Sequence, residues 1–414
     1  MTGLLLATAA WAQDASELAE AETCMEARDF AGALAAYDRA IEAAPGDARG
    51  HVGRARALHA LRRFDDALES VARAIRLAPE ADASPLELRA LIYVARGASI
   101  KALPDLTSAI EIDPGCSRLY RARADVLKEH YDYAGAVRDY SKAYDLDPTD
   151  ITALERRAQT KELLGDFEGA VADYSLVAAT VPHAARPLEL RGNALLKVGD
   201  AKGAIADYDA ALGKDEKSAP ARIGRARALL ALGEKEAADT DAEKSVRVPA
   251  RASAFSDRGL YWYDTLRFKE AVADLSAAVK RDPDGQDYAR LYLLLARARV
   301  GERAEAAAEL KAYALIWRGE TDWYWRLARF LCGDMKEEDL LHAATRLKVG
   351  SYRTEQNDSQ SRERECEACW YAGAVRLLDG AAAQAKALFE RCVATDVRTF
   401  IEYESAKAAL AAMK

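Results

Sequence analysis

The sequence contains few residues of the kinds that build catalytic or metal centres. Five histidines occur in 414 residues, and none stands in a His-Glu-x-x-His pattern. Neither a glycine-rich phosphate loop nor a Gly-x-Ser-x-Gly elbow is present. We therefore expect no catalytic residues, no metal and no cofactor. An enzyme is the third and last class of function to consider.

Long apolar runs and an excess of basic residues are also missing. No stretch is apolar for long enough to span a bilayer, so we expect no transmembrane segment. The chain has 59 Lys and Arg against 67 Asp and Glu, a net charge of −8. This balance argues against nucleic acid as the main partner.

Proline, in contrast, recurs with a period of about 34 residues. The series is Pro45, Pro79, Pro114, Pro148 and Pro182, and it resumes at Pro249 and Pro283 after a gap at Glu216. An alanine lies 11 or 12 residues before each expected proline: Ala33, Ala67, Ala102, Ala136, Ala170, Ala204, Ala238 and Ala271. A fixed period of this length indicates one supersecondary unit that is copied and stacked.

The clearest copy, residues 151–182, predicts two helices. One apolar helical face contains Leu154 and Ala158, and a second contains Ala170 and Tyr174. Gly165 separates the two, and a proline, which cannot continue a helix, ends the second. Good copies begin near Asp14, Ala48, Ala83, Ser117, Ile151, Ala185, Ala219 and Ala252, and a degenerate ninth covers Asp287–Ile316.

This unit resembles the tetratricopeptide repeat. The matching features are small residues where the helices cross, Ala158 and Ala170, the aromatic Tyr174 and the closing Pro182. The resemblance implies an all-α, right-handed superhelical solenoid over residues 13–316. It also implies that the first helix of each hairpin lines a concave groove for a protein partner.

When the repeats are aligned on their first helices, charged side chains are expected to face the groove. The basic candidates are Arg49, Arg56, His59, Arg118, Arg121 and Lys128, and the acidic ones are Glu155, Glu162 and Glu189. A groove that changes sign along its length would orient an extended peptide of complementary charge. The alternative is a solvated charged face without a partner.

A second periodic signal pairs arginine with aspartate 16 residues later. The pairs are Arg89 with Asp105, Arg123 with Asp139, Arg157 with Asp173, Arg191 with Asp207, Arg225 with Asp241 and Arg258 with Asp274. The turn falls midway, so each hairpin brings Arg and Asp to one level. We interpret the pairs as a structural ion-pair ladder that sets helix register, rather than as a basic track for an anionic polymer.

The N-terminus predicts export. Gly3 to Ala10 is largely apolar, and Ala10-Trp11-Ala12 fits the small-x-small cleavage rule. We interpret residues 1–12 as a signal peptide. No Lys or Arg precedes Arg28, so the basic leader of a signal peptide is absent. This is the pattern expected if the true start of the signal lies upstream. This makes the protein periplasmic or secreted. If the segment is an ordinary apolar helix, the protein is cytoplasmic.

Six cysteines are compatible with disulfides in an oxidising compartment. Cys369 and Cys392 flank Gly380 almost symmetrically, which makes them the first candidate pair. Cys366 is a competing partner. Free buried thiols are the alternative, and a zinc site at Cys366-x-x-Cys369 lacks a second ligand pair.

The 34-residue period fails after residue 316. We expect an aromatic-rich helical segment over 317–349, a polar linker over 350–365, and a terminal hairpin with a capping helix over 366–414. A solenoid needs such a cap because its last repeat cannot bury both faces.

The last 90 or so residues resemble the NlpI family of bacterial envelope tetratricopeptide lipoproteins. The matching residues are Trp325, Phe330, Leu331, Gly333, Glu367, Tyr371, Gly373, Gly380, Ala385, Phe389, Val393, Ala394, Val397, Phe400, Glu402, Ala406 and Leu410. The resemblance implies a periplasmic adaptor that brings envelope enzymes together. The chain departs from that family in its larger number of repeats and its lack of a lipid-attachment box.

The sequence thus predicts a non-enzymatic scaffold that binds other proteins, as peptide segments or as envelope enzymes. A cytoplasmic scaffold in signalling or complex assembly is the alternative, and self-association is left open.

Overall fold

The computed structural model describes residues 16–77, 82–246, 250–316, 323–345 and 354–413. These residues form α-helices and one short 3-10 helix, with no strand among them, so the predicted all-α solenoid is confirmed. The chain divides into two compact units, residues 1–156 and 157–414. The predicted signal peptide, and Pro79, Pro249 and Trp317, lie outside the described residues.

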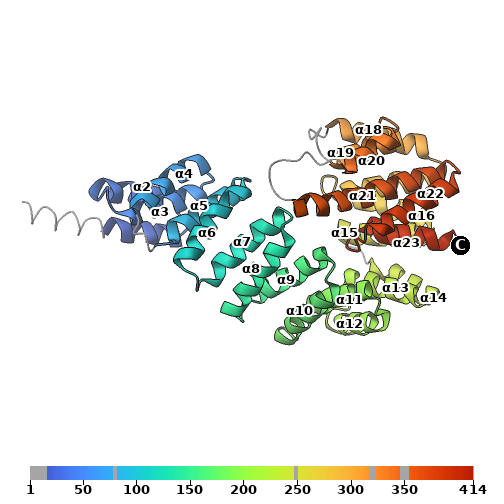
Figure 1. Ribbon diagram of the computed structural model, residues 1–414, viewed down its shortest axis with the longest axis horizontal. Helices are drawn as coiled ribbons and strands as arrows, with labels where there is room; N and C mark the ends of the chain where they lie inside the picture. Colours follow the sequence, from blue (N-terminus) through green and yellow to red (C-terminus); the bar gives the residue numbers. More distant parts are fainter. Residues whose placement is uncertain (1–15, 78–81, 247–249, 317–322, 346–353, 414) are drawn as a thin grey trace, which may run out of the picture. The chain divides into compact units, whose positions relative to one another are not determined.

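Unit 1 is a stack of helical hairpins (Figure 1). After a helix at residues 16–26 it contains α2 (Phe30–Ala43), α3 (Ala48–Ala60), α4 (Phe64–Leu77), α5 (Ser84–Ala95), η1 (Ser99–Lys101), α6 (Ala102–Ile112), α7 (Ser117–Glu129) and α8 (Tyr133–Leu146). The boundary between the units falls within α9 (Ile151–Leu164).

Unit 2 continues the hairpins and ends in a group of helices outside the repeat period. The hairpin helices are α10 (Phe167–Thr180), α11 (Arg186–Val198), α12 (Ala201–Lys214), α13 (Ala219–Ala231), α14 (Lys235–Ser245), α15 (Ala252–Asp264), α16 (Phe268–Arg281), α17 (Asp287–Arg299) and α18 (Arg303–Ile316). The group that follows, here called the C-terminal module, contains α19 (Trp323–Leu331), α20 (Glu337–Thr345), α21 (Thr354–Leu378), α22 (Ala382–Ala394) and α23 (Ile401–Ala412).

An aspartate begins the second helix in four hairpins. Its carboxylate accepts the backbone N–H of the glycine three residues later, which satisfies one of the free donors of the helix end. The pairs are Asp29 with Gly32, Asp132 with Gly135, Asp166 with Gly169 and Asp200 with Gly203. A Cβ on any of these glycines would lie 2.2–2.7 Å from the capping carboxylate. The Asp-x-x-Gly spacing therefore fixes where these helices start.

The turn inside each hairpin needs a left-handed residue. Gly97, Gly165, Gly199, Gly233 and Gly301 take this position with φ between 78° and 97°. In other hairpins a side chain occupies the same place in the period, namely Arg28, Arg62, Tyr131 and Leu266, with φ from 60° to 64°. These four residues adopt a conformation that residues other than glycine seldom adopt. The stacking of the hairpins therefore decides their turn geometry.

A buried tyrosine marks the second helix of four repeats. Tyr37, Tyr140, Tyr174 and Tyr208 are almost completely buried, and each hydroxyl bonds to a polar side chain on the preceding helix: Glu22, Asp125, Glu162 and Asn193. Glycine on the facing helix makes room, because a Cβ at Gly53 would lie 2.1 Å from the ring of Tyr37. The alanines and tyrosines of the period are therefore packing residues.

The structure corrects the predicted linker. Residues 354–365 are the first half of α21, which runs unbroken to Leu378. This stretch is polar but contains no glycine or proline, and its Glu, Gln and Arg residues favour a helix. An ion pair at 2.5 Å from Glu365 to Arg391 attaches it to α22. The remaining linker residues, 350–353, lie outside the described residues.

Candidate functional site

The inner helices of unit 1 border an open cavity of about 990 Å³. Its walls come from the helix at residues 16–26, the turn before α3, α3 itself and the start of α5. Arg49, Val52 and Arg56 of α3 line it, as does Leu18 on the opposite side. Two of the predicted groove residues, Arg49 and Arg56, therefore line this cavity.

These two arginines differ in their partners. The guanidinium of Arg49 lies 2.5 Å from a carboxylate oxygen of Asp47, the residue that caps the same helix. Arg56 is exposed and makes no ion pair within the described residues. His59 lies beside the ring of Phe64, with ring centroids 6.0 Å apart, and burial lowers its pKa. Arg56 is thus the cation that remains available on α3.

The next inner helix, α5, exposes apolar side chains. Leu91 and Val94 are 47% and 43% exposed. They stand 35 residues after Arg56 and His59, which is the local repeat length between Pro79 and Pro114. They therefore occupy the same face of the stack as the predicted basic residues. Exposed apolar side chains next to an available cation suit a peptide ligand.

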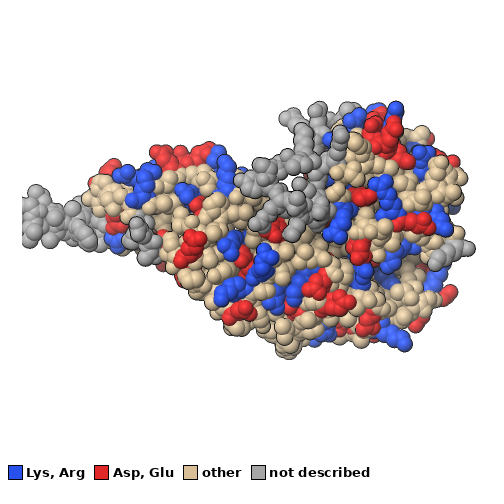
Figure 2. Space-filling view, in the orientation of Figure 1, with Lys and Arg blue, Asp and Glu red and all other residues tan. Residues whose placement is uncertain are grey.

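Acidic side chains pair with three of the six predicted basic residues, Arg49, Arg118 and Arg121. Arg118 pairs with Glu87 and Arg121 pairs with Asp150, each at 2.6 Å. Lys128 is half-buried near the end of α7. On the face drawn in Figure 2, acidic and basic side chains are interspersed rather than gathered by sign.

The predicted acidic residues lie on α9 and α11. Glu162 accepts the hydroxyl proton of Tyr174 at 2.8 Å, and burial raises its pKa. Glu189 accepts a hydrogen bond from Ser218 at 2.5 Å. Glu155 lies on α9. Glu162 and Glu189 therefore have partners inside the stack.

Part of the inner face of unit 2 is covered by the chain itself. Lys197, at the end of α11, lies 3.1 Å from Glu404 of α23. Asp264, at the end of α15, accepts a hydrogen bond from Ser405 at 2.6 Å, and Tyr292 of α17 also contacts Ser405. The last helix thus lies across three inner helices, besides packing on α21 and α22 as a cap does.

The structure brings together all six predicted Arg–Asp pairs. Each arginine places Nε and one Nη within 2.5–2.8 Å of the two carboxylate oxygens, a bidentate contact. The aspartates, Asp105, Asp139, Asp173, Asp207, Asp241 and Asp274, are buried. Because the arginines are used in this way, they offer no basic track on this face.

Comparison with known proteins agrees with this architecture. Residues 18–82 and 189–255 match the tetratricopeptide repeat family. No protein of curated function matches the chain.

Several solved tetratricopeptide proteins match part of this chain, each with a TM-score below 0.5. One, from Parabacteroides merdae, is 19% identical over 56% of this chain and 92% of its own, with a TM-score of 0.42. YrrB, described as a tetratricopeptide protein with an unusual peptide-binding site, is 18% identical over 45% of this chain and 95% of its own, with a TM-score of 0.41. The C-terminal part of a repeat protein from Cytophaga hutchinsonii is 14% identical over 65% of this chain and 96% of its own, with a TM-score of 0.45. The NlpI resemblance of the C-terminal part stays a prediction.

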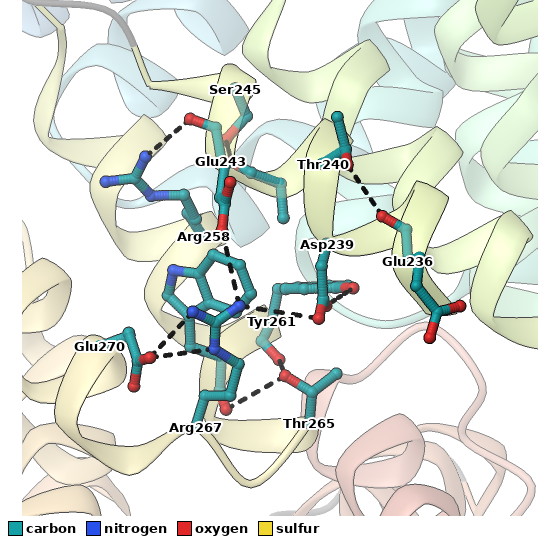
Figure 3. A network of polar contacts seen from close by, with 12 residues as sticks. Glu236, Asp239, Thr240, Glu243, Ser245, Arg258, Tyr261, Thr265, Arg267 and Glu270 are labelled. Carbon is teal, nitrogen blue, oxygen red and sulfur yellow. Dashed lines mark hydrogen bonds and ion pairs between the residues drawn. The ribbon is translucent and has the colours of Figure 1, made fainter. Parts of the chain in front are cut away.

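A dense polar network joins the hairpins α13–α14 and α15–α16 (Figure 3). Arg267 lies over the ring of Trp262 at 4.1 Å and pairs with Glu270 at 2.8 Å, and it also faces Asp239 and Glu243 of α14. Tyr261 donates to Asp239 at 2.9 Å. Because these groups satisfy one another, we interpret the network as a brace between repeats.

The predicted Cys369–Cys392 disulfide is not present. All six cysteines are free thiols, and Cys392 Sγ lies 3.3 Å from Cys366 Sγ. The spacing in the sequence predicts how far along each helix a cysteine lies, but it does not predict in which direction around the helix axis its side chain points. Cys366 and Cys369 point about 60° apart around α21, and the direction of Cys366 is the one that faces Cys392.

Two buried carboxyls in the C-terminal module were not recognised as a pair from the sequence. Glu367 accepts the indole N–H of Trp323, and Glu402 accepts the hydroxyl of Tyr371 at 3.1 Å. Burial and the neighbouring Glu402 raise the pKa of Glu367 to about 8, and burial raises the pKa of Glu402 to about 7. Both residues are among those that match the NlpI family. Their spacing in the sequence does not predict that the two carboxyl groups lie near each other.

Neither a metal-binding group nor a membrane span is found among the described residues. No group of three His, Cys, Asp or Glu side chains in the described part of the chain is placed to hold a metal ion. None of its helices is both long and apolar enough for a membrane span.

Proposed function

We propose that this protein is a non-enzymatic scaffold that binds a protein partner through the inner helices of unit 1. One observation carries the proposal. The inner face of unit 1 presents Leu91, Val94 and Arg56 to solvent, whereas α23 covers part of the inner face of unit 2 and leaves a cavity of about 630 Å³ beside α15 and α17. The more open inner face, that of unit 1, is therefore our candidate for the docking surface.

The chemistry favours an extended peptide with apolar and acidic side chains. Apolar side chains of the partner would cover Leu91 and Val94, at roughly 25 cal/mol per Å² of apolar surface removed from water. A partner carboxylate would pair with Arg56, which fixes the direction of the peptide more than it adds affinity. The cavity beside α3 gives room for a side chain next to Val52.

We further propose a location in the bacterial cell envelope, with an NlpI-like adaptor role toward envelope enzymes. The apolar N-terminus and the resemblance of the last 90 or so residues support this location. A reporter fused after Ala12 tests it, since export of the reporter depends on a working signal. Retention in the cytoplasm would favour the alternative, a cytoplasmic scaffold for complex assembly.

The docking surface is tested with two matched aspartate substitutions. Leu91→Asp places a charge on the proposed surface, and Leu176→Asp places one at an equally exposed leucine on the second helix α10. Each variant is used as bait in affinity purification from cells that contain the native protein's partners. We expect a partner that is recovered by wild type and by Leu176→Asp but lost with Leu91→Asp. Equal recovery by both variants would exclude this surface.

A further inference from the structure

The last helix, α23, contacts the rest of unit 2 through carboxyl groups that have no basic partner. Glu402, in the first turn of α23, accepts a hydrogen bond from the hydroxyl of Tyr371 on α21 at 3.1 Å. Ser405, three residues later, donates to Asp264 of α15 at 2.6 Å. Neither Glu402 nor Asp264 forms an ion pair with a Lys or Arg of the described residues. These contacts differ from the Arg–Asp pairs of the hairpins, in which each carboxylate has a guanidinium beside it.

A third carboxyl, that of Glu367 on α21, belongs to the same cluster. Both glutamates are only 4% exposed, and the charge of Glu402 acts on Glu367 while that of Asp264 acts on Glu402. The other titratable or charged groups that face the three carboxyls within the described part of the chain are Arg227 of α13, Tyr263 of α15, Tyr288 and Tyr292 of α17, Glu363 and Tyr371 of α21, and Glu404 of α23. Arg227 is the single cation in this set, and it faces Asp264.

Carboxyls that share one interface without a paired cation pack most favourably while they hold protons. Burial of an ionised carboxylate without a cation is costly, and like charges at short range repel. In agreement, burial raises the pKa of Glu402 to about 7 and that of Asp264 to about 6, and burial together with Glu402 raises the pKa of Glu367 to about 8. The packed state therefore holds protons that the detached state releases. Attachment of α23 is strongest below the ordinary carboxyl pKa and weakens as the pH rises through the raised values.

We propose that α23 is a pH-controlled latch on the inner face of unit 2, which packs there while Asp264, Glu367 and Glu402 are protonated and detaches as they ionise. The three carboxyls come from α15, α21 and α23, so their mutual repulsion acts across the contact that holds the last helix in place. The ion pair between Lys197 and Glu404 opposes detachment, but it remains formed over the same pH range. Although burial acts to raise it, the ammonium groups of Lys197 and Lys407 lower the pKa of Glu404.

Detachment of α23 changes what unit 2 offers to a ligand. The cavity of about 630 Å³ beside α15 and α17 has Phe400, Ile401 and Glu402 in its lining, so release of the helix removes one of its walls. Release also exposes the helix ends that carry Lys197 and Asp264. The latch thus links pH to access to the inner face of unit 2, and it is independent of the docking proposed for unit 1.

Amide hydrogen exchange of the full-length protein between pH 5 and 8.5 tests the latch. Each rate is divided by that of an unstructured peptide at the same pH, so that the opening equilibrium of each helix remains. We expect the opening of α23 to increase about tenfold per pH unit while one carboxyl titrates. The amides of α12, an outer helix of the same unit, should keep their protection. The proposal is wrong if the protection of α23 does not fall with rising pH, or if α12 loses protection to the same extent.

Matched variants assign the pH dependence to the proposed carboxyls. Glu402→Gln keeps an acceptor for Tyr371 but cannot ionise, so at pH 8 its α23 should open at least about tenfold less often than in wild type. Glu404→Gln, on the same helix, is the control: α23 should open more often at every pH, with the wild-type pH dependence. If Glu402→Gln and Asp264→Asn both keep the wild-type pH dependence, the assignment is wrong. If Glu402→Gln does not fold, Asp264→Asn, which keeps an acceptor for Ser405, decides.

Discussion

Lys197 and Glu404 form an ion pair of 3.1 Å although 207 residues separate them in the chain. Arg398 adds a hydrogen bond to the carbonyl of Lys197 and lies over the ring of Phe167. Together with Ser405 and Asp264, these contacts attach the end of the chain to the inner helices of unit 2. The positions in unit 1 that correspond to Lys197, namely Ala60, Ala95 and Glu129, are exposed.

The Lys197–Glu404 pair is expected to stabilise unit 2 modestly. Glu404→Gln removes one charge and leaves a largely buried ammonium without its partner. Because the Glu404 side chain is 40% exposed, solvent screens the pair, and we expect a loss of about 1 kcal/mol. Urea unfolding followed by tryptophan fluorescence reports it, since Trp262, Trp323 and Trp370 all lie in unit 2. Glu390→Gln, at an exposed pair with Lys386, is the control and should change nothing measurable.

The Arg–Asp ladder is expected to stabilise the stack through buried aspartates. Arg191→Ala leaves Asp207 buried without its bidentate partner, and we expect a loss of about 2–4 kcal/mol. Asp207→Ala should cost less, and the double variant should cost less than the sum of the two. Additive losses in this double-mutant cycle would contradict the ladder. Arg118→Ala, at the more exposed pair with Glu87, should cost only about 0–1 kcal/mol.

Two helical glycines should respond to alanine in opposite directions. A Cβ at Gly224 would lie 2.4 Å from the ring of Tyr208, whereas nothing lies within 4 Å of a Cβ at Gly213. Gly224→Ala should therefore cost about 1–3 kcal/mol by overpacking, and Gly213→Ala should gain about 0.5–1 kcal/mol from helix propensity. Thermal unfolding of both variants measures this. A stabilising Gly224→Ala would mean that the ring of Tyr208 has room to move.

The C-terminal module should lose stability as the pH rises from about 5 to 8. The pKa of Glu367 is raised to about 8 in the folded chain, from 4.5 for an ordinary glutamate, so the folded state holds the proton longer than the unfolded state. Stability is then greatest below the unfolded pKa and falls as the pH rises through the folded one, by up to about 1.4 kcal/mol per pH unit for one group. Glu402, Glu363, Tyr288 and Trp323 face this carboxyl from the surrounding elements.

Glu367→Gln tests the origin of this pH dependence. The amide keeps an acceptor for Trp323 but does not titrate, so the slope of stability against pH should flatten. Urea unfolding at several pH values between 5 and 8.5 compares the variant with wild type. An unchanged slope would assign the pH dependence to other groups, with Glu402→Gln as the next variant to measure.

Oxidation should join Cys366 to Cys392. The two sulfur atoms are 3.3 Å apart, and a thiol–disulfide oxidant of an oxidising compartment would accept the two electrons as both thiols lose a proton. Peptide mapping of unreduced protein from the envelope should show this bond, and protein made in the cytoplasm should show free thiols. A Cys369–Cys392 bond would reinstate the pairing suggested by the sequence.

The sequence was sufficient for the features that repeat. The proline and alanine periods predicted the hairpins, and the Arg–Asp spacing of 16 predicted contacts that the structure shows in every pair, because an antiparallel hairpin fixes which residues lie level. The inner-face position of Leu91 and Val94 could also have been predicted from the sequence, because they occupy the same repeat positions as Arg56 and His59 in the preceding repeat.

Features outside the period were harder to predict. A polar composition suggested a linker over residues 350–365, but a helix already stabilised by packing from Glu365 onward extends through residues 354–365. The contacts of Glu404 and Ser405 with α11 and α15 join residues more than 140 positions apart. Neither period nor spacing carries such information, because the contacts depend on how the C-terminal module folds back in three dimensions.

The placement of α23 has a consequence for biosynthesis. While the ribosome is still translating the codons before Phe400, Lys197 and Asp264 face water, so unit 2 reaches its mature form only when the final helix has emerged. Premature termination before Phe400 should therefore yield chains whose unit 2 lacks the contacts of α23 and is cleaved more readily by proteases.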